Sequence, residues 1–467
     1  MIKSMPMWIR RVIFLLCLCL AQAARSGAEE FLPLEPIGKD ERILILAPHP
    51  DDEAIGCAGL IQQALSAGAQ VGVAYLTNGD HNEVGFIVHE KYPAVFAQQF
   101  IHLGEKRRNE AIKAMQLLGL KRENLVFLGY PDFGTFAIFS QYWQAKIPYM
   151  SLLTRISAVP YKDEFSYKAP YVGESILADL KSVLLRFRPD KIFVSHPADV
   201  NLDHKTLYLF LQVALSDLRK EIPRTKVYPY LIHCVGWPMP RHYHPKLGLM
   251  PPDKFRRSQI KWQRLILANR QVEQKRRAIL CYASQTNSSA FYLLSFARKN
   301  ELFGDYPVVK VKKETSIREK GRHFFSFRDM FRGADIGILG GLEGLGEERP
   351  GVSYGAADNS LLIRVEKREE MLNRFQMQVY LFGYSYKDAF ARMPKIHIAG
   401  KCRNFRVFAN GKMISPEGVF VIMKPTAYIL GVPLKLLGDP DFVLTSMKVY
   451  GGTTAVASVG VQKVEIE

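Results

Sequence analysis

One imidazole and three carboxylates fall within five residues near the start of the chain. The segment 47–53 reads APHPDDE, so two prolines stiffen the turn that holds them. A neutral imidazole and a carboxylate are good zinc ligands, and a catalytic zinc needs three protein ligands and an open position for water. In an extended turn, His49 and Asp52 can face one ion while Asp51 points beside it. The third ligand must therefore come from elsewhere in the chain.

A second polar cluster supplies that ligand. Residues 195–204 read SHPADVNLDH and follow an apolar run. His204 stands where a helix is expected to begin, so its side chain can project back into a crevice. We expect His204 to be the third ligand, and His196 is the alternative.

The elements that position these clusters alternate along the chain. Short apolar runs predict strands, and apolar residues at helical spacing predict helices. The predicted strands are 42–47, 70–76, 124–128, 191–195 and 226–235, and the predicted helices are 54–67, 105–118, 174–187 and 204–218. This alternation predicts an α/β fold with a Rossmann-like, mainly parallel sheet and helices on both faces. Ligands bind such sheets beyond the carboxyl ends of the strands, where the polar clusters stand.

Two long segments interrupt the alternation. Residues 131–172 are rich in aromatic residues, and residues 236–260 are rich in proline, histidine and basic residues. Long irregular segments in a compact domain are usually lids or binding loops. Their rings are expected either to stack on sugars or to pack over the core.

The composition changes after residue 330. Residues 333–351 are rich in glycine but lack the Gly-Lys-Ser/Thr of a phosphate-binding loop. Short β-type runs separated by turn residues follow, as is typical of an all-β sandwich. We therefore predict a large α/β domain over 24–330, a glycine-rich linker over 331–352 and a smaller β-sandwich accessory domain over 353–467.

The N-terminus is typical of an export signal. Basic residues precede the apolar run 12–20, and the small-x-small triplet 21–23 fits a cleavage site. We therefore expect a signal peptide over 1–23 and a periplasmic or extracellular protein. An uncleaved anchor or a lipoprotein modified at Cys17 or Cys19 is the alternative. No later stretch reaches the roughly 20 apolar residues of a membrane span.

The net charge of +18 limits the class of partner. A protein this basic is drawn to polyanions. In an exported protein these would be an acidic polysaccharide or anionic lipid head groups, whereas nucleic acid fits the charge but not the export signal. A solvated basic surface is the alternative. The four cysteines after the signal are too scattered for a zinc ribbon and allow at most an occasional disulfide.

Together, the two polar clusters resemble a known family. PHPDDE at 48–53 followed by HPxDxNxDH at 196–204 is similar to the LmbE-like, or PIG-L, deacetylases, over about residues 42–305. Arg107-x-x-Glu110 and Ser284-Gln285 support the match. The resemblance implies a metal-dependent hydrolase that removes the N-acetyl group from an N-acetylglucosamine-type sugar. It also implies one Zn²⁺ per chain, with another divalent metal such as Fe²⁺ as the alternative.

The resemblance also assigns roles by position. The implied metal ligands are His49, Asp52 and His204, the general base is Asp51, the sugar-binding residues are Arg107 and Asp132, and the residues that orient the site from behind are Glu53 and Asp203. The substrate would be an amino-sugar glycan or glycoconjugate.

One position departs from the family. Several members have a histidine where this chain has Asn201, and a neutral amide can donate only a hydrogen bond to an oxyanion. Either His196 or His233 supplies the missing acid, or Asp51 makes both proton transfers. A glycan-binding protein with an inactive hydrolase domain, and a zinc amidase or esterase for a non-sugar acyl group, are the competing functions.

Overall fold

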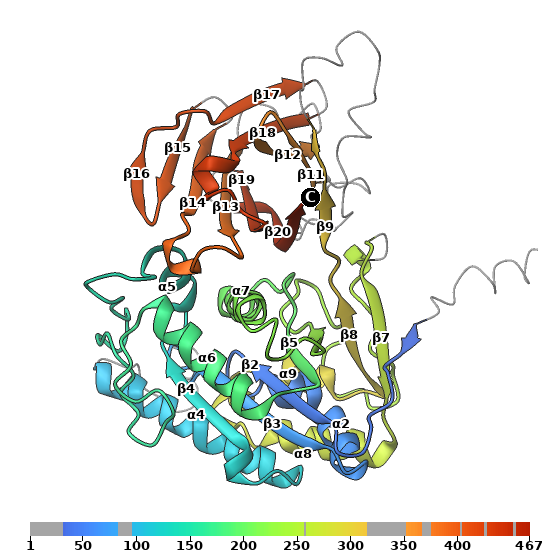
Figure 1. The fold of residues 1–467 in the computed structure, drawn as a ribbon. Helices are drawn as coiled ribbons and strands as arrows, with labels where there is room; N and C mark the ends of the chain where they lie inside the picture. The colour runs from blue at the N-terminus through green and yellow to red at the C-terminus, as the bar shows by residue number, and fades with distance from the viewer. Residues whose placement is uncertain are drawn as a thin grey trace, which may run out of the picture.

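The computed structural model describes residues 31–82, 96–255, 258–314, 352–366, 375–401, 404–424, 427–451 and 454–467. The predicted signal peptide and most of the predicted linker lie outside the described residues. Figure 1 shows an α/β part, in blue through green to gold, below a β-rich part that is mostly orange and red.

The α/β part is built on one sheet of eight strands. Their order is β1-β7-β8-β6-β5-β2-β3-β4. The bounds are β1 Leu32–Pro33, β2 Arg42–Ala47, β3 Gln70–Thr77, β4 Leu125–Tyr130, β5 Lys191–Ser195, β6 Lys226–Tyr230, β7 Lys261–Ile266 and β8 Asn300–Asp305. The run from β6 to β4 is parallel, and β8 is antiparallel to both of its neighbours. The predicted α/β class with a mainly parallel sheet is confirmed.

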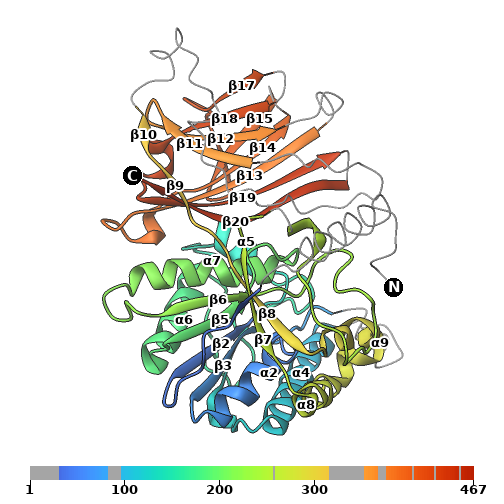
Figure 2. The same cartoon turned by 90° about the vertical axis from the view of Figure 1, so that its right-hand side faces the viewer.

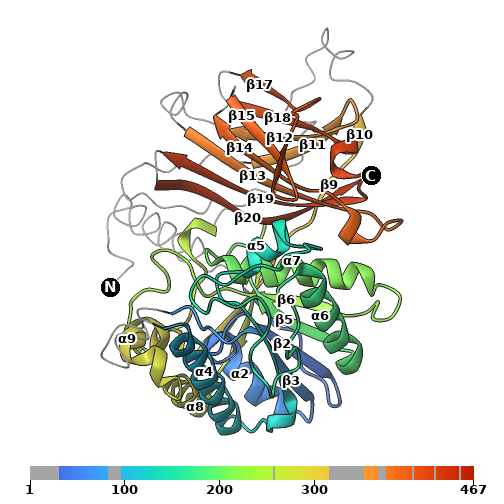
Figure 3. The same cartoon turned by 90° about the vertical axis from the view of Figure 1, so that its left-hand side faces the viewer.

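Alternate residues of β2 face two separate hydrophobic cores. Ile43 and Ile45 pack with α2, α4 and α8, whereas Leu44 and Leu46 pack with α6 and α7. Successive side chains of a strand point to opposite faces, so helices cover both faces of the sheet (Figures 2 and 3). The helices are α2 Asp52–Ser66, α4 Ala97–Leu117, α5 Thr135–Gln141, α6 Gly173–Phe187, α7 Leu202–Asp217, α8 Asn269–Leu280 and α9 Ala283–Leu293.

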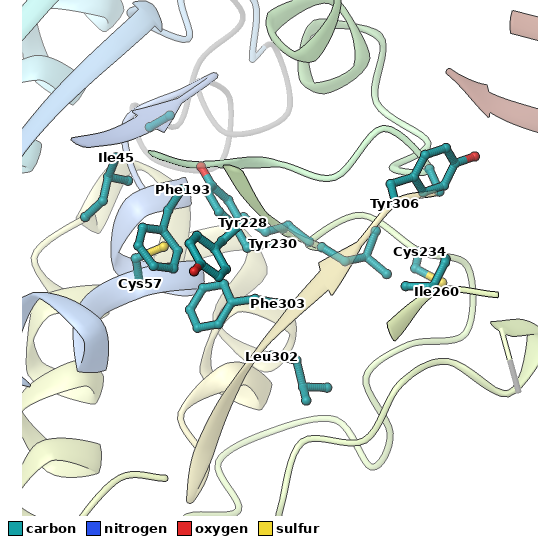
Figure 4. Packing of buried hydrophobic residues seen from close by; sticks show 14 of the residues in the cluster. Ile45, Cys57, Phe193, Tyr228, Tyr230, Cys234, Ile260, Leu302, Phe303 and Tyr306 are labelled. Atoms are coloured by element: carbon teal, nitrogen blue, oxygen red, sulfur yellow. The ribbon is translucent and has the colours of Figure 1, made fainter. Parts of the chain in front are cut away.

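Aromatic packing joins the antiparallel strand β8 to the parallel strands. Phe193 of β5 stacks on Tyr228 of β6 at 5.0 Å between ring centroids and meets Phe303 of β8 edge-on at 4.8 Å (Figure 4). The Tyr230 hydroxyl donates a 2.9 Å hydrogen bond to the Leu46 carbonyl. This buried hydroxyl is therefore satisfied inside the core.

Two sheets form the β-rich part. The 5-stranded sheet has the order β10-β11-β12-β18-β17, and the 7-stranded sheet has the order β16-β15-β14-β13-β19-β20-β9. The bounds are β9 Val309–Val311, β10 Lys313–Glu314, β11 Val352–Ala357, β12 Ser360–Glu366, β13 Phe375–Tyr384, β14 Lys395–Lys401, β15 Asn404–Ala409, β16 Lys412–Ile414, β17 Phe420–Lys424, β18 Ala427–Pro433, β19 Phe442–Gly451 and β20 Thr454–Ile466. Leu361 and Ile363 of one sheet share a core with Val379 and Leu381 of the other, which makes the part a sandwich.

The sandwich begins earlier in the sequence than the boundary that we predicted. β9 pairs with β20, and β10 pairs with β11. Both β9 and β10 precede residue 330. The short runs at 309–311 and 313–314 carry too little periodicity to be recognised alone. They become strands because the C-terminal sheets offer them an edge to pair with.

Other elements also differ from the prediction. The segment predicted as 131–172 contains α5, and Trp143 and Tyr161 within it are buried. The strand predicted over 226–235 ends at Tyr230. Among the described cysteines, Cys57 and Cys281 form no disulfide. No helix of the described residues is both long enough and apolar enough to cross a bilayer.

Candidate active site

A strained turn carries the first cluster from β2 into α2. Asp51, at the start of α2, has a φ of 124°, which costs a non-glycine residue about 1–3 kcal/mol. The carbonyl of Pro48 accepts hydrogen bonds from the backbone N–H and the hydroxyl of Thr77, at 3.0 and 3.1 Å. The Asp51 N–H donates to Glu53 Oε2 at 3.1 Å. These bonds hold the turn that carries Asp51 and Asp52 at the carboxyl end of β2.

Three side chains from the two clusters converge. Asp52 Oδ2 lies 3.1 Å from His49 Nδ1 and 3.1 Å from His204 Nε2. One ligand atom from each residue lies within 4.8 Å of the others, and all three residues are buried. Ligands at about 2.1 Å around a tetrahedral zinc are about 3.4 Å apart, so this spacing suits one ion.

The surroundings of the two histidines favour a cation. Burial alone would lower the pKa of His204, but Asp199 and Asp52 outweigh it and raise that pKa to about 9. His49 shows the same balance, with Asp132 as the main cause of the raised pKa. Neither ring nitrogen of His204 makes a well-aligned hydrogen bond within the described residues, despite the nearby carboxylates. A metal ion would balance the negative charge of these carboxylates and would bind the His204 nitrogen that faces Asp52.

Two carboxylates lie behind His49. Its Nε2 is 3.1 Å from Asp132 Oδ1 and 3.5 Å from Asp203 Oδ2. Asp203 is fixed in turn by the Thr135 hydroxyl and by the Phe133 N–H, the latter at 2.8 Å. A carboxylate on the remote nitrogen fixes the tautomer of a metal-binding histidine and leaves the other nitrogen free to bind. The structure therefore places Asp132, predicted to hold the sugar, against His49.

Asp199 lies behind His204 in the same way, and our prediction of the site missed it. Its Oδ2 is 3.1 Å from His204 Nδ1 and accepts a 2.8 Å hydrogen bond from the His233 N–H. Burial would raise the pKa of Asp199, but the charges of His204 and His233 lower it to about 2. Asp199 was visible in the second cluster, but nothing in the sequence showed which way its carboxylate points.

Asp51 stands beside the three converging residues. Burial raises its pKa to about 7, although the nearby Arg107 opposes that shift. Arg107 Nη2 lies 3.4 Å from Asp51 Oδ1, and the guanidinium also donates to the carbonyls of Gly79 and Pro50, at 3.0 and 2.8 Å. Arg107, predicted to hold the sugar, therefore supports the strained turn as well as lining the pocket.

Glu53 points away from the three residues. Its carboxylate accepts hydrogen bonds from the Asp51 N–H and the Tyr282 hydroxyl, and it is fully buried. Burial raises the pKa of Glu53 to about 8. Its contacts hold the position of Asp51.

A pocket of about 450 Å³ opens over these groups. One wall comes from α9, which Glu110 fixes by accepting hydrogen bonds from the Ser284 N–H and hydroxyl, at 2.9 and 2.5 Å. The described lining residues are His49, Asp51, Asp52, Ile55, His81, Asn82, Arg107, Asp132, Phe133, Asn201, His233, Gln285, Ser289, Tyr292 and Leu293. His81 ends the polar segment 77–81 that follows the predicted strand 70–76, at an end of the sheet where ligands are expected, whereas the sequence offered no signal for Asn82.

The structure places His196, predicted as a catalytic residue, away from the pocket. His196 is not among the described residues that line the pocket; it is fully buried and stacks on Trp262 at 5.5 Å between centroids. Tyr306 meets it edge-on at 5.2 Å. Its Nδ1 accepts a 3.1 Å hydrogen bond from the Ala198 N–H. β7 and the segment after β8 supply the rings that surround His196. Both lie far from His196 in the sequence, so the residues near it could not predict this environment.

Asn201 and His233 both line the pocket, in different ways. The side-chain oxygen of Asn201 caps α7 by accepting a 2.8 Å hydrogen bond from the Asp203 N–H. The His233 ring lies 4.7 Å from the His204 ring, nearly perpendicular to it. Burial lowers the pKa of His233. His233 therefore places a polar ring at the pocket wall, next to the candidate metal ligand His204.

Residues 44–215, which contain both clusters, match the PIG-L family, described as GlcNAc-PI de-N-acetylase. This segment is a PIG-L family domain. Most of β2, strands β3 to β5 and most of α7, with every predicted metal ligand, fall inside the PIG-L domain.

Two curated relatives share part of this domain. A deacetylase of 1D-myo-inositol 2-acetamido-2-deoxy-alpha-D-glucopyranoside from Nocardioides sp. is 34% identical over 104 residues, which is 22% of this chain and 32% of the relative. The enzyme of the same name from Corynebacterium diphtheriae is 38% identical over 81 residues, 17% of this chain and 26% of the relative. The chain thus spans about a third or less of the relatives that it matches.

A solved structure is also similar in part. The N,N'-diacetylchitobiose deacetylase from Pyrococcus horikoshii is 18% identical, with a TM-score of 0.31. The alignment covers 52% of this chain and 70% of that chain.

Proposed function

We propose that this chain is a zinc-dependent deacetylase that hydrolyses the N-acetyl group of an N-acetylglucosamine-type sugar. The observation that carries the proposal is the convergence of His49, Asp52 and His204 beside the buried carboxylate of Asp51, at the floor of a pocket. The PIG-L domain and the names of its relatives support this reaction and this type of substrate.

The residues fit a single zinc ion. Two imidazole nitrogens and one carboxylate oxygen are a ligand set found in catalytic zinc sites, and Asp132, Asp203 and Asp199 lie behind the histidines. When bound, zinc would acidify a water molecule and polarise the acetamide carbonyl. Fe²⁺ is the alternative metal for the same ligands.

Asp51 is the group that moves the proton. Its carboxylate is buried beside the ligands and lines the pocket, and its pKa of about 7 suits both directions of transfer. It accepts a proton from the attacking water and returns it to the departing amine. The C–N bond of the acetamide breaks, and acetate and the free amino sugar leave.

His233 takes the place of the histidine that the family has at Asn201. The side-chain oxygen of Asn201 caps α7, which leaves only its neutral amide N–H groups to donate, and His196 is buried away from the pocket. His233 remains as the polar ring at the pocket wall, 4.7 Å from His204. We assign to it the hydrogen bond that holds the carbonyl oxygen as negative charge develops there.

The substrate is proposed to lie outside the cytoplasm. The signal-like residues 1–23 support export to the periplasm or beyond, and the net charge of +18 supports an anionic glycan or glycoconjugate rather than a neutral one. Nucleic acid is not expected as a partner.

The test combines metal analysis with a substrate panel. Purified protein should contain about one zinc per chain and release acetate from N-acetylglucosamine oligosaccharides faster than from N-acetylated amino acids or acyl esters. Zinc without acetate release would indicate a glycan-binding protein with an inactive site. Preference for a non-sugar acyl group would refute the sugar assignment.

A further inference from the structure

The loop between β5 and α7 lies between two layers of protein. Trp262 and Tyr306 enclose His196. The last strand of the sandwich, β20, contacts the backbone of the next two residues, Pro197 and Ala198. This loop leads directly to Asp199, which lies behind His204, and to His204 itself.

The contact with β20 is made by backbone atoms. The Val461 N–H donates a 2.9 Å hydrogen bond to the Pro197 carbonyl. At Gly460 there is no room for a side chain, because a Cβ there would lie 2.7 Å from the Pro197 oxygen, 2.8 Å from Ala198 Cα and 2.8 Å from the Tyr306 hydroxyl. The strand and the loop therefore approach each other so closely at position 460 that only glycine fits there.

The same sheet also packs on the two helices that leave the site. Figures 2 and 3 show β20 directly above α5 and α7. Phe382 of β13 meets Phe139 of α5 edge-on at 4.9 Å, and the Tyr384 hydroxyl donates a 2.8 Å hydrogen bond to Asp217 of α7. Phe139 and Phe382 are both fully buried. Such a buried aromatic contact is typical of a fixed interface between two parts rather than of a mobile one.

Both helices begin at the site. α7 starts with Leu202, Asp203 and His204, and Thr135 at the start of α5 donates to Asp203. Asp203 in turn lies behind His49. A shift of either helix or of the loop would therefore move the carboxylates that orient both metal-binding histidines.

We infer that the C-terminal sandwich is a structural part of the metal site, acting through β20 on the Pro197–Ala198 backbone, and that Gly460 is a positioning residue. The inference rests on the proposed metal site. It gives a structural role to the predicted accessory domain. The β20 backbone fixes the loop, the loop fixes Asp199, and Asp199 orients His204.

The test compares two glycine variants in the full chain. Gly460→Ala introduces a methyl group against the loop. Gly431→Ala is the control, because it introduces a methyl group against the Phe420 ring in the 5-stranded sheet, within the sandwich. Zinc affinity is measured by competition with a chelator, and hydrogen–deuterium exchange is followed over residues 198–204.

The expected results distinguish a loss of support for the metal site from a general loss of fold stability. Gly460→Ala should lower zinc affinity about tenfold or more and speed exchange over 198–204. Gly431→Ala should lower the melting temperature and leave both quantities as in the wild type. Wild-type zinc affinity and wild-type exchange in Gly460→Ala would overturn the inference. The exchange measurement needs neither metal nor turnover, so a failure of the proposed deacetylase activity would be seen separately.

Discussion

His204 Nε2 lies 3.1 Å from Asp52 Oδ2, although the two residues lie in the first turns of different helices, α7 and α2. The strands β2 and β5, which precede these helices, are parallel neighbours, so their carboxyl ends bring both helix starts to one edge of the sheet. The contact lacks hydrogen-bond alignment, and both side chains are buried. A shared cation explains this pairing, and the predictions below follow from it.

Replacing His204 with alanine should abolish tight zinc binding. The variant removes one of three ligands, and the two that remain cannot hold zinc at micromolar concentration. Zinc content after dialysis should fall from about one per chain to near zero, while circular dichroism shows a folded protein. A variant that kept its zinc would show that His204 is not a ligand.

Asp51→Asn should keep zinc and lose turnover. The amide is nearly the same size but cannot accept the proton of the attacking water, so kcat should fall by about 10²–10⁴-fold. Zinc content measured on the same sample serves as the control. Activity close to that of the wild type would remove Asp51 from the proton transfers.

Asp199→Asn should weaken zinc binding without removing a ligand. The carboxylate near His204 Nδ1 fixes the ring, and loss of such a group typically costs 10–100-fold in metal affinity. Asp253→Asn, in the segment between β6 and β7, is a control outside the described pocket lining. Equal zinc affinity in both variants would contradict the role of Asp199.

His233 and His196 should respond differently to substitution. His233→Ala should lower kcat by about 10²-fold with little change in KM, and His233→Gln should recover part of the loss because it restores a donor. His196→Phe keeps a flat ring on Trp262 but loses the hydrogen bond from the Ala198 N–H, so kcat should fall less than in His233→Ala. A wild-type kcat in the His233→Ala variant would mean that Asn201 or Asp51 acts without His233.

Lys395 at the interface of the two parts should make stability depend on pH. It is 2% exposed, it donates to the Met393 carbonyl at 2.8 Å, and it lies over the Trp143 ring. Burial lowers its pKa from 10.5 to about 7. Between these values the unfolded chain holds a proton that the folded chain has released, so stability contributed by Lys395 rises with pH.

The measurement is the difference in unfolding free energy between the wild type and Lys395→Met. Relative to the variant, the wild type should gain up to about 1.4 kcal/mol per pH unit above pH 7 and nothing below it. A difference that stayed constant from pH 7 to 9 would show that Lys395 remains charged in the folded protein.

The sequence was sufficient to predict the part of the fold that is local. The apolar runs 42–47 and 191–195 identified β2 and β5, and helical spacing identified the helices that follow. The PIG-L resemblance was confirmed, and the predicted metal ligands lie together. Their roles remain proposals.

What the sequence could not show depends on contacts between distant segments. His196 turns toward Trp262 because β7 adds to the sheet beyond β6 and β8, and this strand was not predicted. The early start of the sandwich depends on pairing between β9 and β20, which lie far apart in the chain. The direction of the Asp132 carboxylate toward His49 likewise follows from the position of β4 two strands away.

Anomalous diffraction at the zinc edge from crystals of the full chain tests the central claim most directly. The account predicts one peak within about 2.3 Å of His49 Nδ1, His204 Nε2 and an oxygen of Asp52, with Asp51 beside it. The second buried group that could hold a metal, His49 with Asp132 and Asp203, should show no peak. A peak in that second group, or no peak near His204, would contradict the account.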